Sequence, residues 1–175
     1  MKPALKLTSV PPWATAITLP DADRSGRSWT IIAFGSADDV VSVWTTQLPV
    51  EPTVHRVTTD EEARTALAGD LASAVVGWRL MIAGPANACL RLRACALESG
   101  VADDEMTIAS TEVATRDVQC VHCRTVTTAA VDLESTLRCA GCARMLLVYY
   151  HVSRRQGAHL GFMADAEQQS EAVAS

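Results

Sequence analysis

The sequence lacks a long apolar segment. No run of about 18 apolar residues is free of charge, and no apolar run of about 7 to 15 residues follows the N-terminal lysines. We therefore expect neither a transmembrane helix nor a secretory signal, and we expect a cytoplasmic protein.

Positive charge is also scarce. Fifteen Lys and Arg residues face twenty Asp and Glu residues, which gives a formal net charge of −5 and a pI near 5.3. A negative molecule repels nucleic-acid phosphates and anionic lipid surfaces. The composition therefore argues against nucleic acid and membranes as partners, whereas 49% hydrophobic residues are ample for a buried core.

Strand and helix patterns alternate three times in the first two thirds of the chain. Thr59 and Glu62 have the spacing of a capping box, and Gly100 is placed to end a later helix. Short loops between such elements are typical of a parallel sheet flanked by helices. The predicted strands are 29–34, 53–58, 77–84 and 105–110, and the predicted helices are 38–48, 59–72 and 85–99.

A glycine-rich phosphate loop is missing from the first strand-to-helix turn. This turn reads FGSADDVV and contains only Gly35, whereas dinucleotide-binding turns carry two further glycines. Asp38 and Asp39 stand at the helix start, where they satisfy the helix dipole and would repel a phosphate. We therefore predict no cofactor-binding residue in this chain.

Four of the six cysteines form the pattern C-x2-C-x15-C-x2-C, which is the spacing of a four-thiolate metal site. Each pair can be presented by one tight turn, and Gly141 lies where the second turn must bend. The site favours Zn²⁺, with iron as the alternative, because four thiolates also hold a single iron or a [2Fe–2S] cluster. The predicted metal ligands are Cys120, Cys123, Cys139 and Cys142.

The other titratable side chains suggest no catalytic group. Cys89 and Cys95 lie six apart, a spacing that turns them to different sides of a helix, and we expect small buried hydrophobes. His122 lies between two ligands and is expected to face solvent or support the metal site. His55 has no acidic or cysteine neighbour in the sequence, and neither His151 nor His159 has a nucleophilic arrangement nearby. We therefore predict no catalytic residue.

These patterns predict an α/β fold class. A small parallel-sheet, Rossmann-like N-terminal domain is followed by a β-rich four-cysteine zinc-ribbon domain, because β-branched, aromatic and aliphatic residues flank the cysteine pairs. The predicted divisions are an extended N-terminal arm (1–28) with Trp13 as its anchor, the α/β domain (29–115), the zinc ribbon with a docking segment (116–164) and a tail (165–175).

The stretch RLMIAGPANACLRLRACALESGVADDEMTI resembles the last strand, helix and strand of the nucleotide-binding module in ferredoxin-reductase-type flavoproteins. That module has a Cys-Gly-Pro turn, which here is Ala83-Gly84-Pro85, so the cysteine is lost. The resemblance implies a degenerate reductase-like domain that serves as a docking surface.

The cysteine pairs run into YHVSRRQGAHLGFMADAE, and this combination resembles the small subunit of dimethylamine monooxygenase, a bacterial haem-dependent multicomponent amine oxygenase. The resemblance is strongest over residues 118–167. It implies a heterotrimeric complex that converts dimethylamine to methylamine and formaldehyde with NADPH and O₂. It further implies haem on one partner subunit, and FMN with a [2Fe–2S] cluster on another.

Within such a complex, the resemblance and the closed metal site suggest a non-catalytic assembly subunit that bridges the haem subunit and the flavin/iron–sulfur subunit. The segment 116–159 carries six arginines against three acidic residues, or +3, which suits docking to charged partners. Residues 157–163 are expected to lie against either a partner or this protein's own sheet. Two alternative functions are a four-thiolate iron electron-transfer module and a zinc-ribbon regulator that binds nucleic acid.

Overall fold

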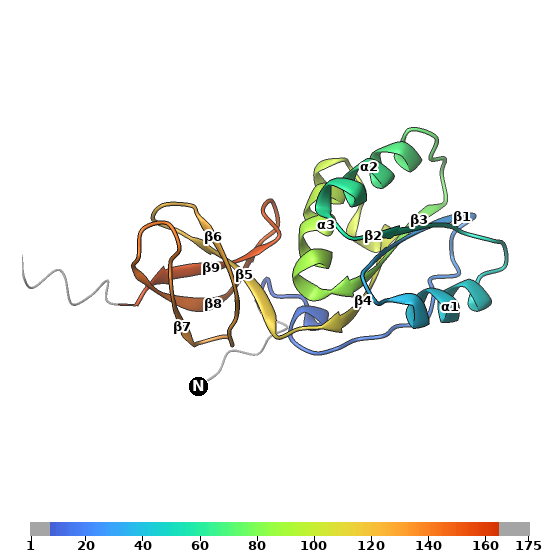
Figure 1. Ribbon diagram of the computed structural model, residues 1–175. Coiled ribbons are helices and arrows are strands. Elements are labelled where there is room, and N and C mark those ends of the chain that lie inside the picture. The colour runs from blue at the N-terminus through green and yellow to red at the C-terminus, as the bar shows by residue number, and fades with distance from the viewer. Residues whose placement is uncertain (1–7, 165–175) are drawn as a thin grey trace, which may run out of the picture. The chain divides into compact units, whose positions relative to one another are not determined.

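The computed structural model describes residues 8–164, and the predicted tail (165–175) lies outside them (Figure 1). The chain forms two compact units. The first, here called the α/β unit, comprises Pro12–Val113 with Arg154–Gly157. The second, here called the cysteine unit, comprises, among the described residues, 8–11, Ala114–Ser153 and 158–164. Among the described helices, none is long and apolar enough to cross a bilayer.

The α/β unit is a four-stranded parallel sheet in the order β2-β1-β3-β4, with helices on both faces. This is the predicted Rossmann-like arrangement. Its strands are β1 (Ser28–Phe34), β2 (Thr53–Val57), β3 (Trp78–Pro85) and β4 (Met106–Glu112). Its helices are α1 (Asp38–Gln47), α2 (Asp60–Leu71) and α3 (Ala86–Glu98), with short 3₁₀ turns η2 (Pro12–Ala14) and η3 (Asp103–Glu105).

Side chains of β1 alternate between two hydrophobic clusters, which lie on opposite faces of the sheet. Ile32 and Phe34 belong to the cluster that includes residues of α2 and α3, whereas Ile31 and Ala33 belong to the cluster that includes residues of α1. A strand buried on both faces is continuously apolar, which explains the unbroken hydrophobic run that begins at Trp29.

Local signals set the helix boundaries as their chemistry requires. The Thr59 Oγ1 accepts from the Glu62 amide at 3.2 Å, and the Glu62 carboxylate accepts from the Thr59 amide at 3.1 Å, so the capping box is confirmed. Amides of Thr58 and Thr59 lower the pKa of Glu62 by stabilising its charged form. Pro85 precedes α3 as its N-cap residue and does not begin the helix.

Gly84 is required by a close approach of two strands at the C-terminal end of β3. Its φ is +148°, and a Cβ at this position would lie 2.7 Å from the Cβ of Phe34 on β1. An L side chain therefore fails here on both backbone and steric grounds.

The N-terminal arm is held against the α/β unit by tryptophan side chains. The indole N–H groups of Trp44 and Trp29 donate to the carbonyl oxygens of Pro20 (2.8 Å) and Asp23 (2.6 Å). Trp13 packs against the cluster that contains α3 residues, as its predicted role as an anchor requires. The part of the arm from Pro12 onward is therefore fixed at several points.

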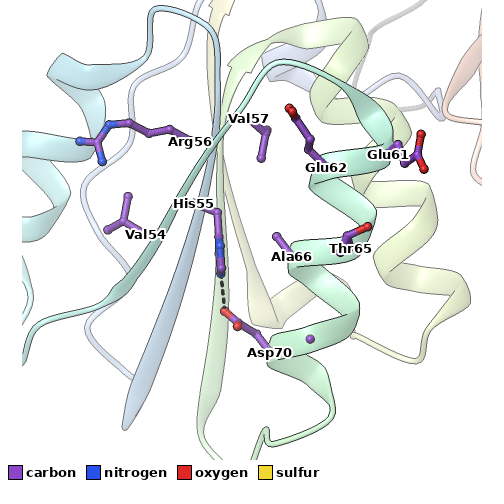
Figure 2. A pocket seen from close by; sticks show the side chains of 10 residues that line it. Val54, His55, Arg56, Val57, Glu61, Glu62, Thr65, Ala66 and Asp70 are labelled. Carbon is purple, nitrogen blue, oxygen red and sulfur yellow. Dashed lines mark hydrogen bonds and ion pairs between the residues drawn. The ribbon is translucent and has the colours of Figure 1, made fainter.

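A chain of polar side chains crosses the otherwise apolar face beneath α2. The Trp78 Nε1 donates to Thr30 Oγ1 at 3.0 Å, and the Thr30 hydroxyl donates to Asp70 Oδ2 at 2.6 Å. His55 on β2 points toward Asp70, with its Nε2 3.0 Å from Oδ2 (Figure 2). His55 is half-buried, as an ordinary strand histidine is expected to be, but it does have an acidic partner, which lies on α2, fifteen residues later.

The cysteine unit is a five-stranded sheet in the order β6-β5-β9-β8-β7. Strands β5 and β9 are parallel, and the other pairs are antiparallel. A Cβ on Gly161 would lie 2.8 Å from Val118 Cγ1, so Ala158–Met163, within the predicted segment 157–163, packs into this protein's own sheet. The strands are β5 (Thr115–Cys120), β6 (Val126–Ala130), β7 (Thr136–Arg138), β8 (Met145–Ser153) and β9 (Ala158–Met163).

The buried polar chain yields a first prediction. Thr30→Val removes the hydroxyl that Trp78 and Asp70 share, and leaves the buried Trp78 indole and the half-buried Asp70 carboxylate without this partner. We expect a loss of about 1–3 kcal/mol in the free energy of unfolding, measured by urea denaturation. Thr46→Val is the matched control, because the exposed Thr46 hydroxyl bonds only within its own helix, and its effect should stay within about 0.5 kcal/mol. Equal effects of the two variants would contradict the role given to Thr30.

Candidate metal centre

Two turns of the cysteine unit have the same backbone geometry. In the first, the Arg124 amide donates to the Cys120 carbonyl (2.8 Å) and the Cys120 amide donates to the Thr125 carbonyl (2.9 Å). In the second, the Ala143 amide donates to the Cys139 carbonyl (3.0 Å) and the Cys139 amide to the carbonyl two residues after Cys142 (2.9 Å). The repeated C-x2-C motif thus folds twice into one kind of turn.

Both turns contain a non-glycine residue with left-handed backbone geometry at the same place. Arg124 has φ of 64° and Ala143 has φ of 60°, one residue after the second cysteine of each pair. This conformation costs an L residue about 1–2 kcal/mol, so other interactions in the turns must offset it.

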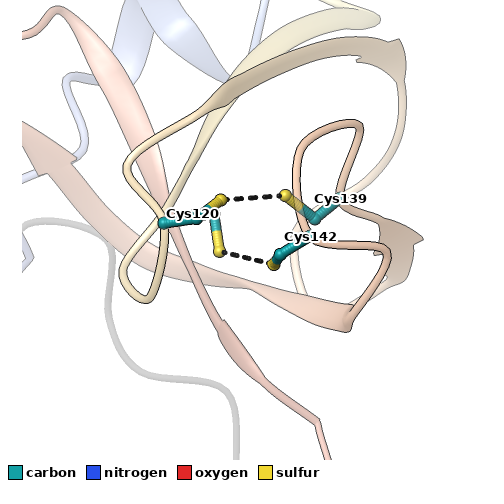
Figure 3. Close-up of side chains that lie close together, drawn as sticks. Cys120, Cys139 and Cys142 are labelled. Atoms are coloured by element: carbon teal, nitrogen blue, oxygen red, sulfur yellow. Dashed lines mark hydrogen bonds between the residues drawn. The ribbon is translucent and has the colours of Figure 1, made fainter.

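The two turns place four sulfur atoms together, all within 4.8 Å of one another. The Cys120 and Cys142 sulfurs are 3.8 Å apart, and those of Cys123 and Cys139 are 3.5 Å apart (Figure 3). A tetrahedron with metal–sulfur bonds of about 2.3 Å has sulfur–sulfur edges of about 3.8 Å. The four cysteines can therefore hold one metal ion, and all four are free of disulfides.

The short distances among the four sulfur atoms suit a single metal ion better than a two-iron cluster. A [2Fe–2S] cluster would spread its two thiolate pairs apart by the distance between the irons, whereas here the sulfurs of different pairs approach to 3.5 Å. Four protein sulfurs around one ion also leave no open coordination position for water or substrate.

Gly141 is needed for space and not for a sharp bend, which corrects the sequence interpretation. Its φ is not in the left-handed region, but an added Cβ would lie 2.2 Å from Thr125 Oγ1 and 3.2 Å from Cys123 Sγ. The Gly141 amide also approaches Cys139 Sγ at 3.4 Å. Only glycine lets the second turn come this close to the first.

Hydrogen bonds and burial give the thiols of the site different pKa values. The hydroxyl and then the amide of Thr125 lower the pKa of Cys123 to about 6, and amides led by that of Cys142 lower the pKa of Cys139. The Arg144 amide lowers the pKa of Cys142, but burial and the three other thiols outweigh it and raise this pKa to about 11. Because ligating cysteines must be thiolates, a bound cation supplies the charge that lets all four ionise together.

The other cysteines and the exposed histidines lie outside this group. Cys89 is fully buried, and burial raises its pKa to about 12, so it behaves as an inert hydrophobe. Cys95 is half-buried against the same core. His122 is exposed on the first turn, and His151 is exposed on β8.

His159 is the titratable residue of this unit that the sequence interpretation missed. It is 1% exposed, its Nδ1 has no hydrogen-bond partner among the described residues, and burial followed by the Arg116 charge lowers its pKa to about 4, against an opposing effect of Asp117. Arg116 is itself buried, and its guanidinium donates to the carbonyl oxygens of Val131 and Ala114. The signal available in the sequence was a histidine placed in a strand on the same side as its buried neighbours.

Residues 117–162 match the family model of the dimethylamine monooxygenase subunit DmmA-like, C-terminal domain. The matched range covers the two cysteine turns and most of the sheet that carries them. This part of the chain is therefore similar to that domain, and the resemblance stated from the sequence is confirmed.

The chain is also similar to a curated protein, the heme-dependent oxidative N-demethylase delta subunit of Ectopseudomonas mendocina (strain ymp), with 39% identity over 107 residues. The alignment covers 61% of this chain and 60% of the relative, so the chain spans about three fifths of that protein's length. No solved structure matches the chain.

The second turn yields a prediction with two variants of opposite sign. Gly141→Ala places a methyl group against Thr125 and should lower stability by about 1–3 kcal/mol, with weaker metal retention. Ala143→Gly relieves a left-handed residue and should raise stability by about 0.5–1 kcal/mol. Thermal unfolding, with a chelator competition for bound metal, measures both. Effects of the same sign would contradict this account of the turn.

Burial of His159 predicts an acid-dependent loss of stability. The folded pKa of about 4 lies below the unfolded value of about 6.5, so the unfolded state binds the proton more tightly. The stabilising effect is complete above pH 6.5 and is lost as pH falls toward 4, to a total of at most about 3 kcal/mol.

Urea denaturation between pH 7 and pH 5 measures this slope. The comparison is with His159→Leu, which lacks the titrating ring but keeps the cysteine turns. Acid release of metal affects both proteins, so the difference between their slopes isolates His159. Identical slopes would refute the prediction.

Proposed function

We propose that this chain is a non-catalytic assembly subunit of a haem-dependent oxidative N-demethylase complex. The observation that carries the proposal is the match of residues 117–162, centred on the cysteine turns, to a DmmA-like domain. The 39% identity to a delta subunit of a heme-dependent oxidative N-demethylase supports it. The proposed reaction of the complex is removal of a methyl group from dimethylamine, which gives methylamine and formaldehyde with NADPH and O₂.

The chemistry of the described residues supports a structural role. Four sulfurs enclose the candidate metal position, and such a closed site stabilises a fold without activating a substrate. The groove that contains the His55–Asp70 pair has no serine or cysteine among its lining residues. We therefore assign oxygen activation to a haem subunit, and electron delivery to a subunit with flavin and a [2Fe–2S] cluster. This chain would join the two.

We propose Zn²⁺ as the ion held by Cys120, Cys123, Cys139 and Cys142. The small cysteine unit has a modest hydrophobic core, and a structural metal contributes directly to the folding of such a unit. The sulfur positions suit a single tetrahedral ion, and a ribbon of this kind would present the docking segment. We place the protein in the cytoplasm, where thiols at metal-ligand spacing stay reduced.

Charge on the cysteine unit is weaker than the sequence suggested. The full sequence segments of this unit (1–11, 114–153 and 158–175) carry six Lys and Arg residues against six Asp and Glu residues, a net charge of 0, and four thiolates around a divalent cation add −2. Because this unit then carries no positive excess, we do not base nucleic-acid binding on it. Recognition of partner subunits would depend on shape and local pairing.

The decisive experiment is co-expression with the haem subunit and the reductase subunit of the same complex, followed by purification through a tag on this chain. We expect a stable heteromeric complex that contains about one zinc per copy of this chain by elemental analysis. Colourless chain purified alone would agree with zinc, whereas a red, redox-active chain would favour the iron electron-transfer alternative. A chain that binds neither subunit would refute the assembly role.

Cys139→Ser tests the link between metal and assembly. Removal of one ligand leaves three thiolates and should abolish zinc retention, unfold the cysteine unit and release the partner subunits, as size-exclusion chromatography and metal analysis would report. Cys95→Ser is the matched control, because Cys95 is a free, half-buried cysteine outside the site, and it should retain metal and partners. A metal-free Cys139→Ser protein that stays folded and assembled would contradict the proposal.

A further inference from the structure

The outer edge of the parallel sheet in the α/β unit forms a groove with α2. Its volume is about 810 Å³, and it is lined by four consecutive residues of β2 and by a stripe of α2 (Figure 2). Side chains of consecutive strand residues point to opposite faces, so a cavity that touches all four must run along the strand backbone. The lining residues are Val54, His55, Arg56, Val57, Glu61, Glu62, Thr65, Ala66, Gly69 and Asp70.

The two walls of the groove have matching lengths. Four strand residues span about 13 Å, and the helical stripe from Glu61 to Asp70 rises about 14 Å. The stripe is two residues wide and repeats every fourth residue, so it follows the helix along one side. A groove of this length accommodates an extended peptide of about four residues.

The backbone of β2 has hydrogen-bonding groups directed into this groove. The Val57 carbonyl accepts from the Gly35 amide at the end of β1, so Val57 and the residues of the same parity face the sheet. The N–H and C=O groups of Val54 and Arg56 then point outward. The sheet order places β2 at the edge, with no further strand beside it in the described part of the chain.

The opposite edge of the same sheet is β4, and it contacts the chain's own N-terminal arm. There the Ser110 amide on β4 donates to the Thr18 carbonyl at 2.9 Å, and the Thr18 amide donates to Ser110 Oγ at 3.0 Å. An extended segment of the chain's own arm thus pairs with β4 at one isolated bridge. No such segment pairs with β2 among the described residues, so this edge can accept an extended segment of another chain.

Charge in the groove favours a basic peptide. The carboxylate of Asp70 is fixed at one end by Thr30 and His55, and Glu61 lies exposed at the other end. Glu62 is engaged by Thr58 and Thr59, and the Arg56 side chain is paired with Asp38 at 2.7 Å. Across Pro12–Val113, seven arginines face fourteen acidic residues, a net charge of −7.

We propose that the β2 edge accepts an extended, lysine- or arginine-containing segment of a partner subunit as a fifth strand of this sheet. The segment pairs its main chain with Val54 and Arg56, and alternate side chains enter the groove toward Glu61 and Asp70. Main-chain pairing provides affinity and the acidic groove selects the partner's side chains. The inference rests on the proposed function, because it names the surface through which that complex assembles.

Gly69 provides a matched pair of variants. A Cβ on Gly69 meets no atom within 4 Å, so side chains fit there without strain and should not disturb α2. Gly69→Arg places a bulky positive group in the groove and should weaken assembly with the co-expressed haem and reductase subunits about tenfold or more. Gly69→Ala leaves the groove open and should assemble as the unaltered chain does.

Val54→Pro tests the main-chain pairing. The substitution removes one outward N–H and leaves the pairing of β2 with β1 intact, and edge strands tolerate proline at such positions. We expect Val54→Pro to weaken assembly about tenfold, whereas Val54→Ala keeps the N–H and should bind normally. Circular dichroism and zinc content, unchanged in all four variants, would exclude global misfolding as the cause.

Hydrogen–deuterium exchange on the full chain, alone and in the purified complex, locates the contact. The proposal expects the amides of Val54 and Arg56 to exchange rapidly in the free chain and to become at least about tenfold slower in the complex. Raising salt should weaken assembly, because opposite charges meet in the groove.

The outcomes separate this inference from the proposed function. If the complex forms but β2 stays unprotected and Gly69→Arg assembles normally, the edge inference is overturned and the assembly role stands. If no complex forms, both are overturned. If the free chain is a dimer with β2 already protected, a second copy occupies the edge and the inference is again wrong.

Discussion

The convergence of four sulfur atoms is the constraint on which the cysteine unit depends. They lie within 4.8 Å of one another and come from two turns, one between β5 and β6 and the other between β7 and β8. Against the opposing effect of the Arg144 amide, burial followed by hydrogen bonds with the three other thiols raises the pKa of Cys142 to about 11. The turns tolerate left-handed residues at Arg124 and Ala143, and Gly141 removes the one side chain that would keep them apart. Local strain and charge are thus concentrated where a cation would offset both.

The α/β unit keeps the layout of a nucleotide-binding module but uses its surfaces differently. At the start of α1, where a phosphate would bind, Asp38 pairs with Arg56 of β2. The N-terminal arm covers part of β4, and tryptophan side chains hold it in place. These features favour contacts between polypeptide segments over contacts with a cofactor. The same unit contains the His55–Asp70 pair, which orders a carboxylate beside an open strand edge.

The similarity to the DmmA-like domain is carried by the cysteine unit, since the matched residues 117–162 fall almost wholly within it. A closed four-cysteine site and a parallel sheet with an acidic groove are both suited to holding proteins together. In the assembly role proposed above, the chain would contact its partner subunits through these two separate surfaces.

The sequence alone determined the features that depend on near neighbours in the chain. The alternating strands and helices, the Thr59–Glu62 capping box and the cysteine spacing all follow from short-range periodicity and turn chemistry. Tertiary structure decided the rest, because the contacts of a strand residue come from segments far away in the sequence, and local patterns do not show which segments meet. His55 gained an acidic partner from α2, Ala158–Met163 became β9 of the protein's own sheet, and Gly141 proved necessary for its distance to Thr125. The short strand β7 carries too few residues for a period to emerge, so only pairing with β8 revealed it.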